Sequence, residues 1–385
     1  MHSIASFDRY IEKEIADKKT VYAAYQVTRG RETVYGGAFG MADLEKRIPF
    51  TEKSVLRLAS MTKPLTGSAV MKARELGCLS LSDKVSRYIP GFRTMRVALF
   101  SEEGEITGEK PAENELTVAS LLNHTNGLGT GKVPCRLLEE AKPGEKLSSL
   151  VPRYPEQLLD FEPYTATGYS ATMAFDVAAY LVELTSGMEY EEFLRKYILD
   201  PLGMEDTGYN LTPSMQERLA KLYRADGEIT LVGEKGGILP RLSTTFKAGG
   251  TQLYSTLSDY RQFALMLLCG GKGEDRKVLS QESVRLLSSP SLPAPLRGGC
   301  EEWGLSMRVI TRKDPPGQML DPGCYGWSGA YETHFFVDPG HDLTAILMKN
   351  IANGLGAGAP SARAFEKAVA CEIDRGAFPH GDQSC

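Results

Sequence analysis

Leu58-Ala59-Ser60-Met61-Thr62-Lys63 stands directly before an apolar run, residues 66–73, that favours a helix. Residues three apart lie on one face of a helix, so Ser60 and Lys63 would present a hydroxyl and an amine side by side. A serine hydroxyl becomes a nucleophile when a base lies beside it, and burial favours the uncharged lysine that serves as this base. At a helix start, the N–H of Ser60 would also be available to bind negative charge. The alternative is an ordinary helix with a serine at its start and a solvated lysine.

The composition is that of a globular protein, with 385 residues, 42% hydrophobic and 24% charged. A net charge of -5 gives no reason to expect nucleic acid or a membrane as a partner. Segment 1–10 lacks the basic start and apolar core of a secretion signal, and the seven cysteines form no Cys-x-x-Cys pair. We therefore expect a cytoplasmic protein with reduced thiols, without a metal or another cofactor.

Strand-like runs occur near both ends of the chain. They lie at residues 20–27, 32–39, 303–310, 332–337 and 343–349. Helical patterns dominate the middle, and the acidic residues 102–115 predict an exposed loop. This order predicts an α/β (α+β) fold with a sheet built from both chain ends. The expected domains are an α/β unit of residues 1–78 and 228–385 and a mainly helical unit of residues 79–227.

A second candidate element is Gly168-Tyr169-Ser170-Ala171, which precedes a predicted helix containing Asp176. A tyrosine near a lysine loses its proton readily and can carry it between a nucleophile and a leaving group. The alternative is a core tyrosine whose hydroxyl is satisfied by a neighbour.

A third element is Tyr325-Gly326-Trp327-Ser328-Gly329-Ala330-Tyr331, which leads into a predicted strand. Gly329 would let a ligand approach the strand edge, and the N–H that follows it can bind an oxyanion. The alternative is an ordinary turn before a strand.

Together, the motifs Ser60-x-x-Lys63, Tyr169-Ser170-Ala171 and Trp327-Ser328-Gly329 resemble the three motifs of the serine β-lactamase superfamily. The most similar branch contains the class C β-lactamases and the family VIII carboxylesterases. Accessory stretches of this branch are matched in the same order, at residues 121–128, 201–207 and 249–256. The resemblance extends from about residue 22 to residue 349.

The resemblance implies a β-lactamase/transpeptidase-like fold, with a mainly antiparallel sheet flanked by helices and the site between the sheet and an inserted helical domain. It implies that Ser60 is the nucleophile and that Lys63 and Tyr169 take and return its proton. The N–H groups of Ser60 and Ala330 would form the oxyanion hole. The substrate-binding strand would consist of Trp327, Ser328 and Gly329.

Two departures bear on the substrate. Class C β-lactamases and penicillin-binding proteins have Lys-Thr-Gly as the third motif, and Trp327 replaces that lysine, so a substrate carboxylate loses its cationic partner. Ala171 stands where the second motif has an asparagine that would hold a substrate amide. Lys235-Gly236-Gly237 is rejected as a displaced third motif because no strand-like run follows it. The sequence also lacks the Gly-x-Ser-x-Gly of an α/β-hydrolase.

We therefore expect a serine hydrolase that cleaves small carboxylic esters through an acyl-enzyme on Ser60. β-Lactamase or D-amino acid peptidase activity and acyl transfer to an alcohol are alternatives within the same family. A non-catalytic binding or sensor module is an alternative of another class, and the intact Ser60, Lys63 and Tyr169 argue against it. The expected partner is a small-molecule ester or amide. Segments 129–168 and 271–302 are expected to shape the pocket, while the oligomeric state and the natural acyl and leaving groups are left open.

Overall fold

The computed structural model describes residues 2–139, 141–142, 144–232, 245–313 and 319–376. Within these ranges the largest sheet has eight strands in the order β10-β11-β12-β13-β14-β1-β2-β3, and neighbouring strands are antiparallel. These strands are β1 (Tyr22–Arg29), β2 (Glu32–Asp43), β3 (Ile48–Pro49), β10 (Glu301–Trp303), β11 (Arg308–Ile310), β12 (Tyr325–Ser328), β13 (His334–Asp338) and β14 (Leu343–Met348). Because β1 pairs with β14, the two ends of the chain form one sheet. The expected antiparallel sheet flanked by helices is thereby confirmed.

The remaining elements are helices and short strands, most of them between β3 and β10. The helices are α1 (Ala5–Ala16), α2 (Thr62–Glu75), α3 (Val118–Leu122), α4 (Arg136–Glu139), α5 (Leu147–Leu150), α6 (Met173–Ser186), α7 (Tyr190–Leu194), α8 (Pro213–Glu217), α9 (Leu257–Leu268), α10 (Gln281–Leu287) and α11 (Pro360–Asp374). The short strands are β4 (Leu56–Arg57), β5 (Arg96–Phe100), β6 (Ile106–Pro111), β7 (Tyr223–Ala225), β8 (Ile229–Leu231) and β9 (Tyr254–Ser255). The division of the chain into two domains stays a prediction.

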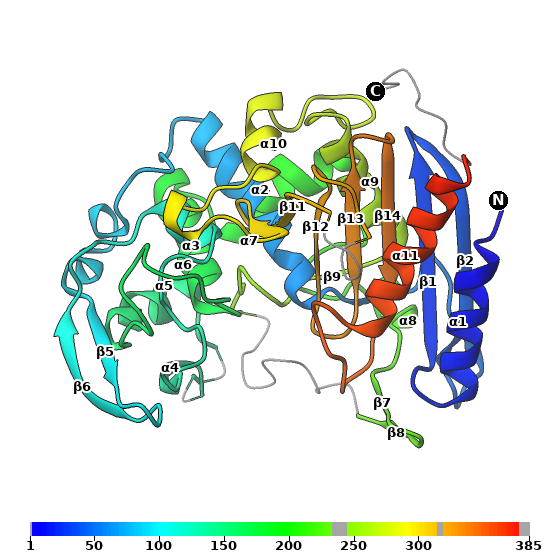
Figure 1. Cartoon of the computed structure of the whole chain (residues 1–385), viewed down its shortest axis with the longest axis horizontal. Coiled ribbons are helices and arrows are strands. Elements are labelled where there is room, and N and C mark those ends of the chain that lie inside the picture. Colours follow the sequence, from blue (N-terminus) through cyan, green and yellow to red (C-terminus); the bar gives the residue numbers. More distant parts are fainter. Residues whose placement is uncertain (1, 140, 143, 233–244, 314–318, 377–385) are drawn as a thin grey trace.

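Helices cover both faces of the sheet (Figure 1). Helices α1 and α11 pack on one face, where the rings of Phe336 and Phe365 lie 6.2 Å apart. Helix α9 packs on the other face, where the rings of Tyr260 and Phe335 lie 5.1 Å apart. Successive side chains of a strand point to opposite faces, so β13 contributes Phe335 to one apolar layer and Phe336 to the other. This alternation is why the sheet needs helices on both sides.

The predicted single strand over residues 303–310 is wrong. Strand β10 ends at Trp303, β11 begins at Arg308, and these two residues pair across a turn. Within the turn Ser306 has a φ of 78°, which is incompatible with an extended strand. The turn packs against α2, where a Cβ at Gly67 would lie only 2.1 Å from Ser306 Oγ. The turn between β10 and β11 is thus fixed by a tertiary contact, which the local sequence pattern cannot reveal.

The predicted loop over residues 102–115 is also wrong, because it contains strand β6, which pairs with β5 as a hairpin. The residues of β6 are mostly exposed. A strand with a polar composition on both faces lacks the alternation that identifies strands, and this explains the error.

The cysteines depart from the expectation of uniformly reduced thiols. Cys78, Cys324 and Cys371 carry free thiols, whereas Cys269 is disulfide-bonded. The cytoplasmic location stays a prediction. In the described ranges, no helix has the length and apolarity needed to cross a bilayer. The same ranges contain no cluster of three or more His, Cys, Asp or Glu side chains that could hold a metal.

Candidate active site

Ser60 and Lys63 meet in the interior of the protein. Ser60 lies in a short 3₁₀ helix, Ala59–Met61, immediately before α2 rather than in α2 itself. Lys63 Nζ lies 3.3 Å from Ser60 Oγ, and the lysine is 0% exposed. The same nitrogen donates to the carbonyl oxygens of Ala171 at 2.6 Å and Gly250 at 3.0 Å. The alternative of a solvated lysine is therefore excluded.

The three partners of Lys63 suit both protonation states of its amine. A neutral amine has two hydrogens for the carbonyls of Ala171 and Gly250 and one lone pair for the hydroxyl of Ser60. An ammonium group has three hydrogens and can donate to all three partners. The Ser60 proton can thus pass to Lys63 without a change of partners, as general base catalysis needs.

The backbone beside Ser60 is held in an unusual conformation. Ala59 has a φ of 48°, in the left-handed region that residues with a Cβ rarely adopt. The neighbouring carbonyl of Leu58 accepts hydrogen bonds from the Met61 N–H at 3.1 Å and the Thr333 hydroxyl at 3.0 Å. Such strain persists where the surrounding structure determines it, often at functional sites.

Gly329 brings the end of β12 against this turn. A Cβ at position 329 would lie 2.3 Å from Leu58 O and 2.2 Å from Thr333 Oγ1, closer than real Cβ atoms come to other atoms. In the described part of the chain, neither the N–H of Ala330 nor that of Ser60 has a hydrogen-bond partner. An oxyanion hole needs two such unpaired donors, and this role for Ser60 and Ala330 stays a prediction.

Tyr169 joins the site through its ring rather than its hydroxyl. Lys63 Nζ lies over the ring, 5.0 Å from its centroid. The phenol oxygen accepts a hydrogen bond of 3.4 Å from Trp327 Nε1. Among the described residues it has no hydrogen bond to Ser60 or Lys63. The structure thus brings the three predicted catalytic residues together, while the proton-carrying role of Tyr169 stays a prediction.

Sequence reasoning missed Trp303, which completes an aromatic frame around Tyr169. Its ring stacks on Tyr169 at 5.9 Å and lies 4.6 Å from the ring of Trp327. His124 packs 4.2 Å from Trp303, and its Nδ1 accepts the N–H of Ser170 at 3.1 Å. Burial, and then the charge of Lys63, hold the pKa of His124 well below its usual value. The chain has only two tryptophans, and their rarity was the signal that could have pointed to this contact.

Asp176 supports the carbonyl that contacts Lys63. Its carboxylate accepts the Gly249 N–H at 3.0 Å and the Tyr154 hydroxyl at 2.9 Å. Burial raises the pKa of Asp176 to about 7. The bond to Gly249 fixes the backbone from which Gly250 offers its carbonyl to Lys63. In the sequence, only its place in the first turn of an apolar helix distinguished this aspartate.

The end of β12 has one open edge. It pairs with β11 through Tyr325 and Gly326, whereas Trp327 and Ser328 extend beyond that pairing. On their other side, these two residues pair with β13. An open strand edge offers backbone groups along which an extended ligand can align. The predicted substrate-binding strand therefore has the geometry that such binding requires.

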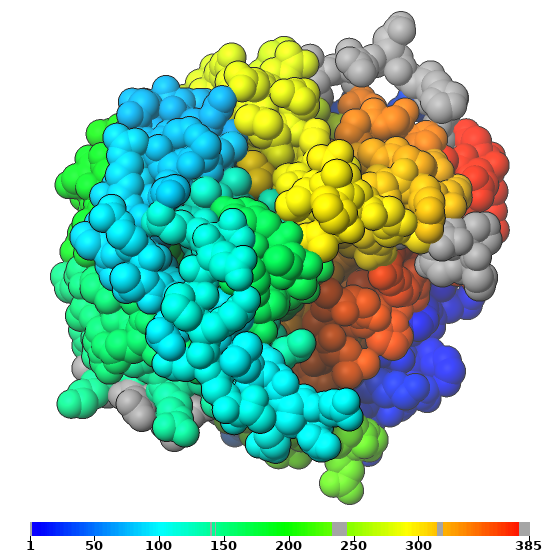
Figure 2. Space-filling view, turned by 60° about the vertical axis from the view of Figure 1, so that its left-hand side comes forward, coloured from blue at the N-terminus to red at the C-terminus, as the bar shows by residue number. Residues whose placement is uncertain are grey.

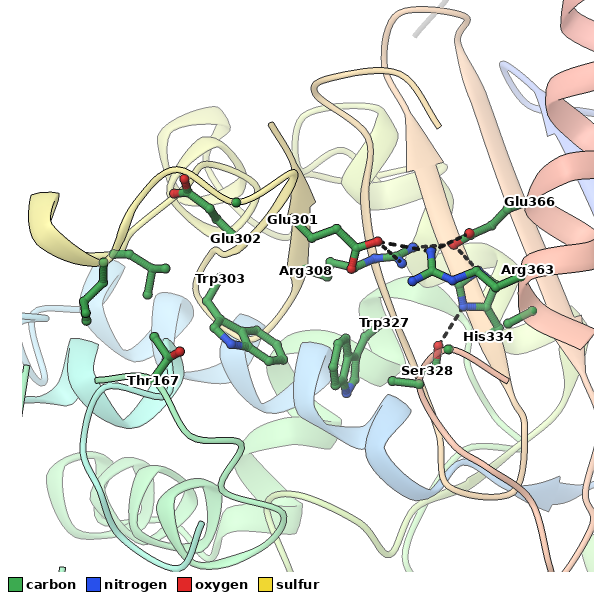
Figure 3. Close-up of a pocket in the computed structure, with 16 residues that line it drawn as sticks. Thr167, Glu301, Glu302, Trp303, Arg308, Trp327, Ser328, His334, Arg363 and Glu366 are labelled. Carbon is green, nitrogen blue, oxygen red and sulfur yellow. Dashed lines mark hydrogen bonds and ion pairs between the residues drawn. The ribbon is translucent and has the colours of Figure 1, made fainter. Parts of the chain in front are cut away.

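A cavity of about 310 Å³ lies beside Trp327 and Ser328 (Figure 3). Thr167, Leu292 and Leu296 line it together with Trp303, so residues of both 129–168 and 271–302 reach it. Figure 2 shows a hollow on this side of the molecule, overhung by the yellow segment around residues 290–300. Ser60 does not line the cavity, but Trp327 contacts both the cavity and Tyr169.

The antiparallel sheet and the Ser60–Lys63 pair before a buried helix define the class of the protein, a serine hydrolase with a β-lactamase fold. The family model described as Beta-lactamase matches residues 7–368, and the chain belongs to this family. The match extends beyond both ends of the resemblance read from the sequence.

Relatives in this family differ in their named activities. The chain is 28% identical over 354 residues to Protein Rv1367c of Mycobacterium tuberculosis, covering 87% of each chain. It is 28% identical over 380 residues to Esterase EstB of Burkholderia gladioli, covering 90% of each chain. The solved structure of EstCE1, a hydrolase with promiscuous acyltransferase activity, has a TM-score of 0.75 at 20% identity, covering 95% of this chain and 98% of that one.

Proposed function

We propose that this protein hydrolyses small carboxylic esters through an acyl-enzyme on Ser60. The observation that carries the proposal is the 3.3 Å contact between Ser60 Oγ and the buried Nζ of Lys63. The similarity to EstB over nearly the whole chain supports an ester as the substrate.

In the proposed reaction, Lys63 takes the proton of Ser60 while Oγ attacks the ester carbonyl. The N–H groups of Ser60 and Ala330 bind the carbonyl oxygen as it becomes negative. The leaving alcohol receives the proton, and water then attacks the acyl-enzyme with the same base. Tyr169 would pass the proton to the alcohol, which requires its hydroxyl to approach Lys63. Catalytic hydrogen bonds often form only when substrate is bound.

The third motif favours a neutral ester over a β-lactam or a D-amino acid peptide. Trp327 Nε1 is an uncharged donor to Tyr169, at a position where the related β-lactamases have a lysine. The guanidinium of Arg308 in the adjoining cavity is already paired with Glu301 and Glu366. A substrate carboxylate therefore meets no unpaired cation among these groups.

The test combines substrate profiling with trapping of the acyl-enzyme. We expect p-nitrophenyl esters with short acyl chains to be cleaved at least tenfold faster than a chromogenic cephalosporin, compared by kcat/KM. Intact mass after quenching should show an acyl adduct that Ser60→Ala abolishes. Adding a primary alcohol to the assay measures acyl transfer against hydrolysis.

Ser68→Ala is a matched control, because it removes a different buried hydroxyl, that of a serine in α2 which donates to the carbonyl of Pro64. This variant should keep the adduct. An adduct that persists in Ser60→Ala would place the nucleophile elsewhere, and efficient cephalosporin hydrolysis would favour a β-lactamase instead.

A further inference from the structure

Ser328, His334 and Glu366 form a chain of polar contacts at the edge of the cavity (Figure 3). Ser328 and His334 are paired across β12 and β13, and Ser328 Oγ lies 2.8 Å from His334 Nδ1. His334 Nε2 lies 3.3 Å from Glu366 Oε1, within ion-pair distance although short of good hydrogen-bond geometry. Glu366 belongs to α11, so three separate elements meet at this chain.

The charges around this chain balance one another. Arg308 pairs with Glu366 and, at 3.1 Å, with Glu301. Arg363 pairs with the same two carboxylates, at 2.9 Å and 3.1 Å. Burial opposes the ionisation of Glu366, but these arginines and His334 lower the pKa of its carboxyl overall. Glu366 is thus an ionised group that can only accept hydrogen bonds.

These contacts decide where the protons lie. Burial lowers the pKa of His334, so its ring is neutral and carries one N–H. Because Glu366 can only accept, that N–H belongs on Nε2, and Nδ1 is left as an acceptor. The Ser328 hydroxyl must then donate to Nδ1. Its oxygen consequently faces the cavity with lone pairs rather than with a hydrogen.

We propose that His334 fixes the Ser328 hydroxyl as a hydrogen-bond acceptor, and that the cavity thereby selects an uncharged substrate group that donates a hydrogen bond, such as an alcohol. The part of this inference that concerns which esters are cleaved rests on the proposed esterase function. His334 is a positioning residue in this scheme, because it acts on the substrate through Ser328.

The shape and charge of the cavity fit such a group. Its volume of about 310 Å³ and its wall of Leu292, Leu296 and Trp303 suit a short alkyl chain that ends at Ser328. A carboxylate at the same place would face the lone pairs of Ser328 and find both neighbouring guanidiniums engaged by Glu301 and Glu366. The site therefore disfavours an acid and favours an alcohol.

The test uses three p-nitrophenyl esters whose acyl chains have equal length and end in a methyl, a hydroxymethyl or a carboxylate group. A parallel series carries these ends on the alcohol side of an acetate ester, so that both orientations in the cavity are covered. We expect the hydroxyl end to be preferred over the methyl end by about three- to tenfold in one series, with the difference in KM, as one neutral hydrogen bond provides. The carboxylate end should be the poorest substrate of that series.

His334→Phe frees the Ser328 hydroxyl to donate, so the preference for the hydroxyl end should vanish and the disadvantage of the carboxylate should shrink. Ser328→Ala, which keeps the ring of His334, should also remove the preference for the hydroxyl end and serves if His334→Phe does not fold. Thr28→Val removes a buried hydroxyl elsewhere in the sheet, one that contacts Thr344 at 2.7 Å, and should leave all ratios unchanged. The inference would be overturned if the wild type cleaved the methyl and hydroxyl ends equally well in both series, or if the variants slowed all three esters alike.

Binding separates this inference from the proposed function. Calorimetry measures how tightly Ser60→Ala binds each of the same esters, and so gives the selectivity of the cavity without turnover. If the wild type cleaves no ester but Ser60→Ala binds the hydroxyl end best, the proposed function fails and the inference stands. If esters are cleaved and bound without this preference, the inference fails and the proposed function stands.

Discussion

Replacing Gly329 by alanine tests whether the contact between β12 and the Ser60 turn builds the site. The added Cβ would lie 2.3 Å from Leu58 O, whereas ordinary contacts begin at 3.4 Å, so the two backbones must separate by about 1 Å. Neither neighbour moves freely, because the carbonyl of Leu58 accepts hydrogen bonds from both the Met61 N–H and the Thr333 hydroxyl.

Two magnitudes follow from this separation. Overpacking of a close contact costs about 1–3 kcal/mol of stability. Moving the N–H of Ala330 away from the developing oxyanion removes one donor, which typically costs about 10²–10³ in kcat. We therefore expect Gly329→Ala to be folded and modestly destabilised, but slower in acylation by about two to three orders of magnitude.

The assay pairs the rate of acylation by a p-nitrophenyl ester with urea unfolding. Gly108→Ala is the matched control, because the nearest atom to its added Cβ is Leu99 Cδ1 at 3.7 Å. The control should keep the wild-type rate and change stability by less than about 0.5 kcal/mol. A Gly329→Ala variant with the wild-type rate would refute the reasoning, since the second oxyanion donor could then not depend on this contact.

Three further changes test the surroundings of the nucleophile. Lys63→Ala should slow acylation by about 10²–10⁴, measured by stopped flow, whereas Lys72→Ala on the same helix should keep the wild-type rate. A wild-type rate of acylation in Lys63→Ala would show that another group is the base. Burial raises the pKa of Asp176 from its ordinary 3.8 to about 7, so the folded state holds a proton that the unfolded state releases, and the free energy of unfolding should fall as pH rises between about 4 and 7. Asp176→Asn should lack this fall, and the same pH dependence of urea unfolding in the wild type and the variant would contradict the assignment. Trp327→Lys should raise cephalosporin turnover relative to ester turnover at least about tenfold by supplying a cation for the carboxylate, and an unchanged ratio of kcat/KM values would contradict that role.

Much of the fold follows from patterns within a few residues of chain. The strand-like runs at both ends form one antiparallel sheet because their apolar residues face helices on both sides. The errors lie where this pattern fails. Exposed β6 has no apolar face to reveal it, and the turn between β10 and β11 depends on the close packing of Ser306 against Gly67.

Ser60 and Lys63 could be paired from the sequence because their contact is local, three residues apart in one turn. The other partners of Lys63 could not be predicted, since the carbonyls of Ala171 and Gly250 lie 108 and 187 residues away. Only the packing of α2 against other segments brings them to one nitrogen.

The sequence by itself therefore determined the nucleophile candidate, its neighbouring amine and a sheet built from both chain ends, because helical and strand periodicities encode neighbours within one turn or one strand. The antiparallel order of the sheet was implied by the resemblance to the β-lactamase superfamily. The tertiary structure alone decided which groups surround them. It turns the Tyr169 hydroxyl toward Trp327 and sets Trp303 against the ring of Tyr169. It also joins Ser328 to Glu366 through His334, because strand register and helix packing place groups from β12, β13 and α11 together, and no local pattern carries that information.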